Sequence, residues 1–496
     1  MAARAKTPTY IAELPLAATR EDERVLDHCR YLGLQADHCM VKEANRRLGR
    51  YYKDRAVHEL LKRVRQNGYK LSPADKKVLG DKRMEYGLSE YDFHAYLKVF
   101  GRRVSGWLDA NTVQKIATRV WQAASAVLFG RGGRVCYRRY DQFLSLEGKT
   151  NTMGIRYKDG CLIWGKRLKV PVVVRGSDRW LQRALQDRVK YCRVVARWHK
   201  TRWKYHLQLV LEGTPPVKPR RKAVEAEVGL DMGPSAIAAV SEGGILFQEL
   251  GGEVTSIEAE TARLLRKLDR HRRANNPDNY DAAGRVKRLK RGQRRVWVLS
   301  NGYIKTRNQI RTLRAKRRAL LKEAHIKLAR QLLEQMGNTF VVEKLSWSGL
   351  AKRARETRVN EKTGRPARKK RFGKSVQNHA PSAFLSILTR MAGAAGGGVI
   401  QVDPGPIKAS QYDHTDGAYT KVPLSQRRKR LSNGDEVLRD LYSAFLLLNH
   451  DNSYTGIDQA RCEASYAAFK ARHDELVEEL RRQKAGGRQF PSCMGL

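Results

Sequence analysis

The sequence is poor in cysteine pairs and in long hydrophobic runs. Its seven cysteines are scattered and form no CxxC pair, which is typical of a reducing compartment rather than of a disulfide-bonded or cysteine-rich zinc protein. No apolar run approaches the roughly 18 residues that a membrane span needs. Residues 1–14 show neither a secretory signal nor an amphipathic helix. We therefore expect a soluble intracellular protein with no membrane partner.

Acidic residues are also scarce. Asp and Glu number 50 against 98 Lys and Arg, which gives a net charge of +48. A typical sequence-specific DNA-binding protein neutralises about 6 to 10 phosphates, so this surplus points to a much larger polyanion. The chain is nevertheless 496 residues long and 41% hydrophobic, which suits two to four folded domains and excludes a simple basic tail.

Three regions with different residue patterns follow one another along the chain. Residues 20–131 have apolar side chains at three- and four-residue spacing, which predicts an all-helical lobe. Residues 132–221 contain short β-rich runs between turns and end in a linker with three prolines, which predicts a small β-barrel or sandwich. Residues 222–410 predict three strands, two long basic helices, a strand, a helix and a further strand. This last order of elements is that of ribonuclease H.

Three acidic residues lie in the predicted strands and at the start of the closing helix. Asp231 ends the first strand, Glu343 lies in the fourth, and Asp440 begins a closing helix. An acid among apolar residues at a strand end is costly to bury without a cation or donors, and three together favour a divalent metal. Two Mg²⁺ ions about 4 Å apart would suit phosphodiester cleavage. Plainer interpretations are that Asp231 caps a turn and Asp440 caps a helix, with Asp435 as a rival to Asp440.

Basic residues cluster in several candidate nucleic-acid contacts. Two tryptophans alternate with arginines in the last strands of the β-rich region, where they either stack bases or belong to the core: Arg193, Arg197, Trp198, Arg202 and Trp203. Two further segments are dense in cations, and a solvated charged face is the plainer interpretation of them. Their candidate residues are Lys287, Arg288, Lys290, Arg291, Arg294 and Arg295, then Arg365, Arg368, Lys369, Lys370 and Arg371.

The motifs around the three acids resemble those of a known family. "VGLDMG", "VVEKLSWSGL" and "RDLYSAFLL" resemble the three RuvC motifs of the compact type V CRISPR effector nucleases and their transposon-encoded TnpB relatives. "VDPGPIKASQYDHTDG" resembles the segment before their third motif, and the resemblance covers most of residues 132–450. It implies a multidomain α/β protein with an RNase H-like (RuvC) nuclease domain, an OB-like β-barrel wedge domain and an all-helical recognition lobe.

The resemblance also implies a division of the chain. The segments are 1–19, the start of the wedge domain; 20–131, the recognition lobe; 132–221, the wedge domain and linker; 222–410, the first part of the nuclease domain; 411–434, a loop that binds target nucleic acid; 435–454, the closing helix; and 455–496, a C-terminal helix and tail.

The implied function is RNA-guided cleavage of DNA by two-metal catalysis in bacterial defence, in the cytoplasm. The partners would be a guide RNA, with structured scaffold and spacer, and double-stranded target DNA with a short flanking motif. We expect one chain per guide RNA, and Mg²⁺ as the cofactor with Mn²⁺ as a substitute. Two alternatives stay open: an RNA-guided protein that silences DNA without cutting it, and a guide-free junction or transposon nuclease.

One departure from the family concerns zinc. Many relatives carry paired CxxC motifs before the third acid, but no cysteine lies between Gln411 and Asp440. Asp413, His414 and Asp416 are too clustered to close a tetrahedral site, so zinc is not expected. We expect this loop to be ordered either by the packing of its side chains Tyr412, Tyr419 and Val422, or by nucleic acid bound to its cations Arg427, Arg428, Lys429 and Arg430.

Overall fold

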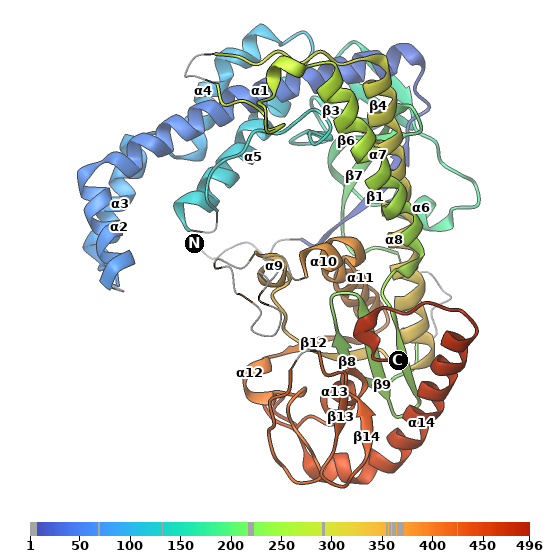
Figure 1. Cartoon of the computed structure of the whole chain (residues 1–496). Helices are drawn as coiled ribbons and strands as arrows, with labels where there is room; N and C mark the ends of the chain where they lie inside the picture. Colours follow the sequence, from blue (N-terminus) through green and yellow to red (C-terminus); the bar gives the residue numbers. More distant parts are fainter. Residues whose placement is uncertain are drawn as a thin grey trace. The chain divides into compact units, whose positions relative to one another are not determined.

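The chain forms two compact units, Met1–Val217 and Lys218–Leu496, in a computed structural model (Figure 1). The structure describes residues 7–67, 70–130, 132–216, 223–289, 293–353, 372–423 and 425–496, with the single residues 356, 359 and 364. Both units combine helices with strands, so the protein is a multidomain α/β protein.

The first unit begins with a strand, β1 (Thr9–Pro15), and continues into helices. The helices are α1 (Arg20–Lys53), α2 (Arg55–Asn67), α3 (Pro73–Glu85), α4 (Glu90–Arg103) and α5 (Ala110–Leu128). Capping boxes start α1, α3 and α4, where Thr19, Ser72 and Ser89 each exchange hydrogen bonds with an aspartate three residues on. Because such boxes satisfy the first free backbone N–H groups, they fix where these helices begin.

Strands make up the rest of the first unit. They are β2 (Ser145–Glu147), β3 (Ile155–Lys158), β4 (Cys161–Trp164), β5 (Leu168–Pro171), β6 (Val189–His199) and β7 (Arg202–Glu212), with the short helix α6 (Arg179–Ala184) before β6. One sheet has the order β1-β7-β6-β2 and the other β3-β4-β5. An isolated bridge between Leu16 and Val172 joins the end of β1 to the end of β5. Since β1 pairs with β7, the helices α1–α5 are an insertion within this β-structure.

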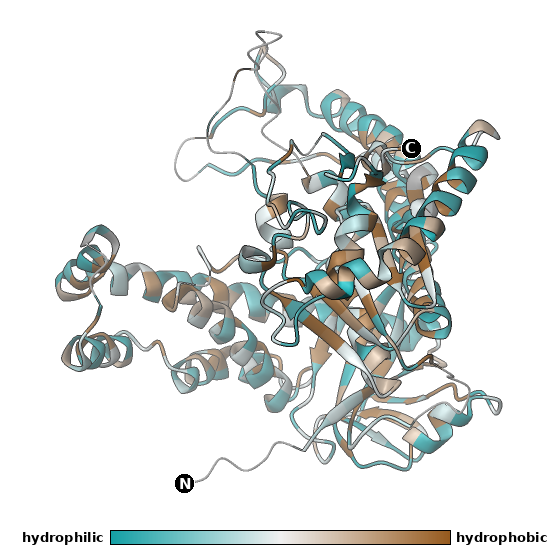
Figure 2. Cartoon of the chain, turned by 90° about the horizontal axis from the view of Figure 1, so that it is seen from below, coloured by the Kyte–Doolittle hydropathy of each residue, from teal (hydrophilic) through white to brown (hydrophobic). Residues whose placement is uncertain are grey.

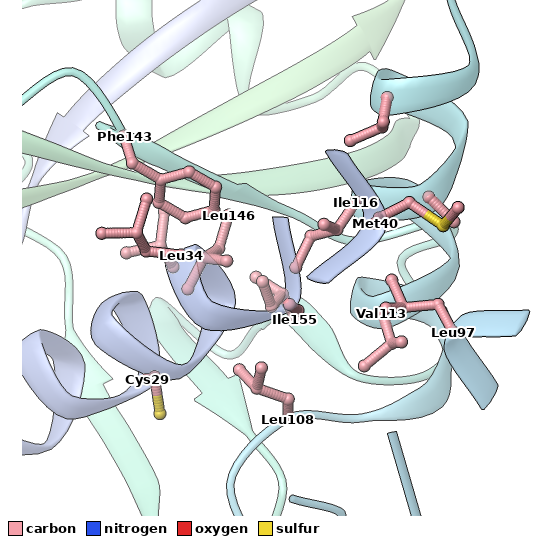
Figure 3. Close-up of a cluster of buried hydrophobic side chains, with 14 of the residues drawn as sticks. Cys29, Leu34, Met40, Leu97, Leu108, Val113, Ile116, Phe143, Leu146 and Ile155 are labelled. Carbon is pink, nitrogen blue, oxygen red and sulfur yellow. The ribbon is translucent and has the colours of Figure 1, made fainter. Parts of the chain in front are cut away.

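Helices and strands of the first unit share a hydrophobic core. Figure 3 shows Leu34 and Met40 of α1 together with Ile116 of α5, Leu146 of β2 and Ile155 of β3. All five side chains are buried. The helical insertion is therefore packed onto the strands and does not form a separate core.

The second unit is built on a mixed sheet with the order β10-β9-β8-β11-β12. Its elements are β8 (Glu227–Met232), β9 (Ala236–Ser241), β10 (Gly244–Glu249), α7 (Thr255–Ala274), α8 (Asn301–Gln335), β11 (Thr339–Glu343), α9 (Trp347–Ala351), α10 (Gly373–His379), α11 (Pro381–Ala394), β12 (Gly398–Val402), α12 (Pro404–Ile407), β13 (Arg428–Arg430), β14 (Glu436–Leu438), α13 (Arg439–Leu448) and α14 (Gln459–Ala485). Strands β8, β11 and β12 run parallel, while β9 and β10 run antiparallel to their neighbours.

The two faces of this sheet pack against different helices. Val228, Leu230 and Met232 of β8 belong to a core shared with α8 and α11. The opposite face carries α13, whose apolar residues share a core with Val341 of β11. A Cβ on Gly229 would lie 1.9 Å from the backbone oxygen of Ala444 in α13. Only glycine at this position lets α13 lie directly on β8.

Both polar and apolar residues occur along the same helices in Figure 2, as expected for helices with one buried face. Among the described helices, none combines the length and the apolarity that crossing a membrane requires.

Candidate active site

Asp231 and Glu343 project from the same face of the sheet. Side chains alternate along a strand, and Leu230 and Met232 face α8 and α11, so Asp231 faces α13. The same alternation puts Glu343 on the α13 face, because Phe340 and Val342 lie on the other. Strands β8 and β11 are parallel neighbours with Leu230 opposite Val342. The two carboxylates therefore leave adjacent strands at the same end of the sheet.

Asp440 enters this face from the first turn of α13. The helix N-cap is Leu438, which has no side chain able to cap, so Asp440 is not the helix cap. A carboxylate in a first turn is favoured by the helix dipole. Asp435, the rival candidate, instead accepts hydrogen bonds from Asn433 and from the Tyr466 hydroxyl at 2.8 and 2.9 Å. Its carboxylate is thus engaged within the loop.

The three acids share one electrostatic environment. Burial raises the pKa of Asp231 well above its usual range, and the charges of Asp440 and Glu343 raise it further. The guanidinium groups of Arg439 and Arg427 oppose this rise in the pKa of Asp231. Burial also raises the pKa of Glu343. Carboxylates that repel one another in a desolvated place need a cation to remain ionised together.

Arg439 supplies part of that positive charge. Its Nη2 and Nε donate to Oδ1 of Asp440 at 3.0 and 3.3 Å, and its Nη1 donates to the Gln426 carbonyl oxygen at 3.1 Å. The residue is only 8% exposed. In the part of the chain that the structure describes, no three Asp, Glu, His or Cys side chains are gathered closely enough to hold a metal ion as they stand. Carboxylate oxygens are nevertheless the donors that Mg²⁺ prefers, so the residues fit this ion by donor type and charge.

Arg439 was not among the predicted site residues. It directly precedes Asp440 in "RDLYSAFLL", and this position next to a candidate ligand is the one sequence signal that could have identified it. Its hydrogen bond to Gln426 depends on a loop that returns from thirteen residues earlier, and no local pattern encodes that return.

The loop before α13 is held by buried polar residues. Asp413 accepts hydrogen bonds from the N–H groups of Thr415 and Ser432, both at 3.0 Å. Nδ1 of His414 lies 2.7 Å from the hydroxyl of Tyr442 on α13. Tyr412 is buried, whereas its neighbour Tyr419 is about half exposed, with ring centroids 4.9 Å apart. Val422, the third residue expected to order the loop by packing, is half-buried.

Lys429 requires a correction. We predicted that it binds nucleic acid, but it is only 4% exposed. Its Nζ donates to the backbone oxygens of Gln411 and Tyr412 and lies 5.2 Å from the ring centroid of Tyr442. Lys429 therefore ties the loop to itself and to α13, and it is not presented to a phosphate. Nearby, Arg428 pairs with Glu436, while Arg430 is exposed and Arg427 half-buried.

The arginines predicted in the first unit already have acidic partners. The pairs are Arg193 with Glu147 at 2.6 Å, Arg197 with Glu13 at 2.7 Å and Arg202 with Glu23 at 3.2 Å. Trp203 packs against the core and lies 4.3 Å from the guanidinium carbon of Arg30. Trp198 lies edge to face with Trp203, at 5.2 Å between centroids. Part of this set is thus structural, which agrees with the core interpretation of Trp203.

The remaining cations lie in two segments. Lys287, Arg288 and Arg294 are exposed. Arg295 is half-buried, where it donates to the Lys287 carbonyl oxygen and lies over the ring of Trp297. The others lie outside the described residues: Lys290, Arg291, Arg365, Arg368, Lys369, Lys370 and Arg371.

Comparisons with known proteins give structural neighbours only. No protein-family model matches the sequence, and no curated protein matches it. A Cas12f1–sgRNA–target DNA complex is similar over 89% of this chain and 99% of that chain, with a TM-score of 0.41 and 10% identity. A CRISPR–Cas12f ternary complex covers 85% and 80%, with a TM-score of 0.26 and 12% identity. A Cas12i–crRNA–dsDNA complex covers 90% and 61%, with a TM-score of 0.22 and 9% identity. These neighbours are type V CRISPR effector complexes.

Proposed function

We propose that this chain is an RNA-guided DNA endonuclease of the compact type V kind, which cleaves target DNA at a single RuvC site in bacterial defence. The observation that carries the proposal is that Asp231 and Glu343 leave neighbouring parallel strands at one end of the sheet, and that the charges of Glu343 and Asp440 both act on Asp231. The motifs around these acids, "VGLDMG", "VVEKL" and "RDLYSAFLL", support it independently.

The architecture of the second unit supports a ribonuclease H-like domain. An antiparallel hairpin extends a parallel trio in the order β10-β9-β8-β11-β12, and a later helix packs on β8. For the first unit we propose an OB-like wedge domain, made of β1–β7, and a recognition lobe, made of α1–α5. The bridge between β1 and β5 supports a nearly closed barrel.

Asp231, Glu343 and Asp440 would hold the metal in this site. When bound, a pair of Mg²⁺ ions supplies an activated water and stabilises the leaving oxygen of the phosphodiester. The protein contributes rigidity, because two of the carboxylates come from neighbouring strands and the third from a helix that rests on Gly229. A fixed framework holds the acids in place despite their mutual repulsion.

The net charge of +48 supports the proposal that the chain binds a guide RNA. A structured RNA with its target heteroduplex offers far more phosphates than a short DNA site does, and base pairing then reads the sequence. We propose that protein contacts read only a short flanking motif and that each complex contains one chain and one guide RNA.

A purification followed by a cleavage assay tests this function. The chain, expressed with its native locus, should copurify with a discrete RNA, and that complex should cut matched plasmid DNA in Mg²⁺ or Mn²⁺. A complex lacking the matching spacer is the control and should not cut. Nucleic-acid-free protein that cuts branched DNA would instead establish a guide-free nuclease.

The ion pair between Arg439 and Asp440 favours a second candidate, an RNA-guided protein that binds DNA without cutting it. A third acid engaged by arginine is less ready to take a metal. Tight binding of matched DNA with no cleavage in either metal would establish this candidate.

A further inference from the structure

Arg439 occupies an unusual position for a buried cation. Its guanidinium is shared between the Asp440 carboxylate and the carbonyl oxygen of Gln426, and its own N–H donates to the Arg427 carbonyl oxygen at 2.9 Å. Arg439 is therefore fixed both to the loop that precedes the hairpin β13–β14 and to the third acid. A guanidinium that donates two N–H groups to one carboxylate oxygen in a poorly solvated place is a strong partner for that carboxylate.

We propose that Arg439 is a positioning residue that holds Asp440 in an ion pair, and that Asp440 would have to leave this ion pair before it could serve as a ligand of a divalent cation. This inference rests on the proposed function. It explains why three acids share an electrostatic environment although no metal-holding group is assembled among the described residues.

The physical basis is competition between two cations for one carboxylate. Arg439 neutralises Asp440 while the metal is absent, which limits the repulsion of Asp440 on Asp231 and Glu343. The same positive charge disfavours a divalent cation beside it, because like charges a few ångströms apart repel strongly in a poorly solvated place. Removing the charge should therefore strengthen metal binding, whereas a purely structural arginine would not have this effect.

The hydrogen bond from Arg439 to the Gln426 carbonyl oxygen connects the Arg439–Asp440 ion pair to the hairpin. Gln426 lies two residues before β13, and the exposed Arg430 ends that strand. Any change that moves residues 425–427 also moves the acceptor that fixes Arg439.

Metal titration of the full chain, freed of nucleic acid, tests the inference. Mn²⁺ binding is measured by calorimetry for wild type, Arg439→Met and Arg439→Lys. Arg439→Met should bind Mn²⁺ about tenfold more tightly, since a single nearby charge is removed from a desolvated site. Arg439→Lys retains the charge and should stay within about twofold of wild type on the same reasoning. Lys327→Met, which removes an exposed charge from α8, is the control and should leave the affinity for Mn²⁺ unchanged.

A second readout uses the guided complex. Arg439→Met should lower the Mn²⁺ concentration for half-maximal cleavage, because no guanidinium then competes with the cation for Asp440. Unchanged or weaker Mn²⁺ binding by Arg439→Met would overturn the inference. If this variant fails to fold, Arg439→Gln, which keeps a donor for the Gln426 carbonyl, is judged by the same criterion.

The Asp231→Asn variant separates this inference from the proposed function. If Mn²⁺ binding does not depend on Asp231, the proposed metal site itself is wrong. If it depends on Asp231 but not on the charge at position 439, only the role of Arg439 is wrong.

Discussion

The Asp231 carboxylate lies where its charge is unfavourable. It is desolvated and faces two further acids, so its pKa is raised well above the usual range. Natural proteins accept such an arrangement where function requires it, and neutralising the group then commonly increases stability. Ionised Asp231 thus lowers the stability of the metal-free protein, and a bound cation would remove this destabilisation.

Asp231→Asn should make the metal-free protein more stable at pH 7 to 8 while abolishing cleavage. The native state holds its proton to a higher pH than the unfolded state does, so metal-free wild type gains stability as pH falls towards the ordinary carboxyl range. The melting temperature of Asp231→Asn should exceed that of wild type by a few degrees, since ~1 kcal/mol corresponds to about 2–4 °C in a domain of this size. The advantage should shrink near about pH 4.

Thermal melts with and without Mg²⁺ make the comparison. Mg²⁺ should stabilise wild type and leave Asp231→Asn unaffected. A well-folded Asp231→Asn variant that melts below metal-free wild type would contradict the account.

The hairpin β13–β14 and the loop before it are ordered by hydrogen bonds among their own residues and to Tyr442 of α13. Lys429, Asp413 and His414 are all buried and bonded to backbone or to Tyr442. This network attaches the loop to the helix that carries Asp440. The loop and the candidate active site are therefore parts of one packed element.

Lys429 and Arg430 should respond oppositely to substitution by methionine. Lys429→Met removes donors from two buried carbonyl oxygens and should cost about 1–3 kcal/mol of stability, without changing the salt dependence of DNA binding. Arg430→Met should leave stability within about 0.5 kcal/mol of wild type and reduce the salt slope by about 1 if Arg430 contacts a phosphate. Denaturant melts and filter binding at several salt concentrations measure both. A lower salt slope for Lys429→Met would restore it as a phosphate contact.

Zinc should be absent from the purified protein. His414 is buried against Tyr442, and burial lowers the pKa of His414, which suits a neutral structural imidazole. We expect elemental analysis to find far less than one zinc per chain, and activity lost to a chelator to return with Mg²⁺ alone. Stoichiometric zinc that is lost in His414→Ala would be evidence against this prediction.

The parts of the fold and of the candidate site that could be predicted are those with a local sequence pattern. The acids at strand ends follow from alternation and turn signals, and the structure has Asp231 in β8 and Glu343 as the last residue of β11. The burial of Lys429 could not be predicted, because it lies in a run of four cations that no local feature distinguishes. The contact of Arg439 with Gln426 and of His414 with Tyr442 depends on long-range packing. The assignment of the three acids as metal ligands therefore stays a prediction from the sequence, and the residues that hydrogen-bond around them were visible only in the structure.

The whole chain is a large polycation with a net charge of +48, but not all of its cations are available to phosphates. Several arginines of the first unit are neutralised by partners such as Glu13, Glu23 and Glu147. Cations that carry no such partner are the better candidates for phosphate contacts. If the proposed guided function holds, affinity should come from many point charges, and specificity should come from base pairing.

Neutralising five cations outside the described residues should test this view: Arg365, Arg368, Lys369, Lys370 and Arg371. Nucleic-acid affinity should fall for all sequences alike, and the slope of log K against log salt should flatten by up to about 4.5, because each of five phosphate contacts contributes about 0.9. An altered sequence preference with an unchanged slope would reject the prediction.

Cleavage of a matched plasmid by the RNA-loaded chain in Mg²⁺ tests the central claim most directly. Wild type should cut the matched target, and Glu343→Ala should bind the same target with near-equal affinity while cutting at least about 10³-fold more slowly, since ligands of one catalytic centre act as a unit. Wild-type complex that binds the matched plasmid tightly and leaves it intact in both Mg²⁺ and Mn²⁺ would contradict the account.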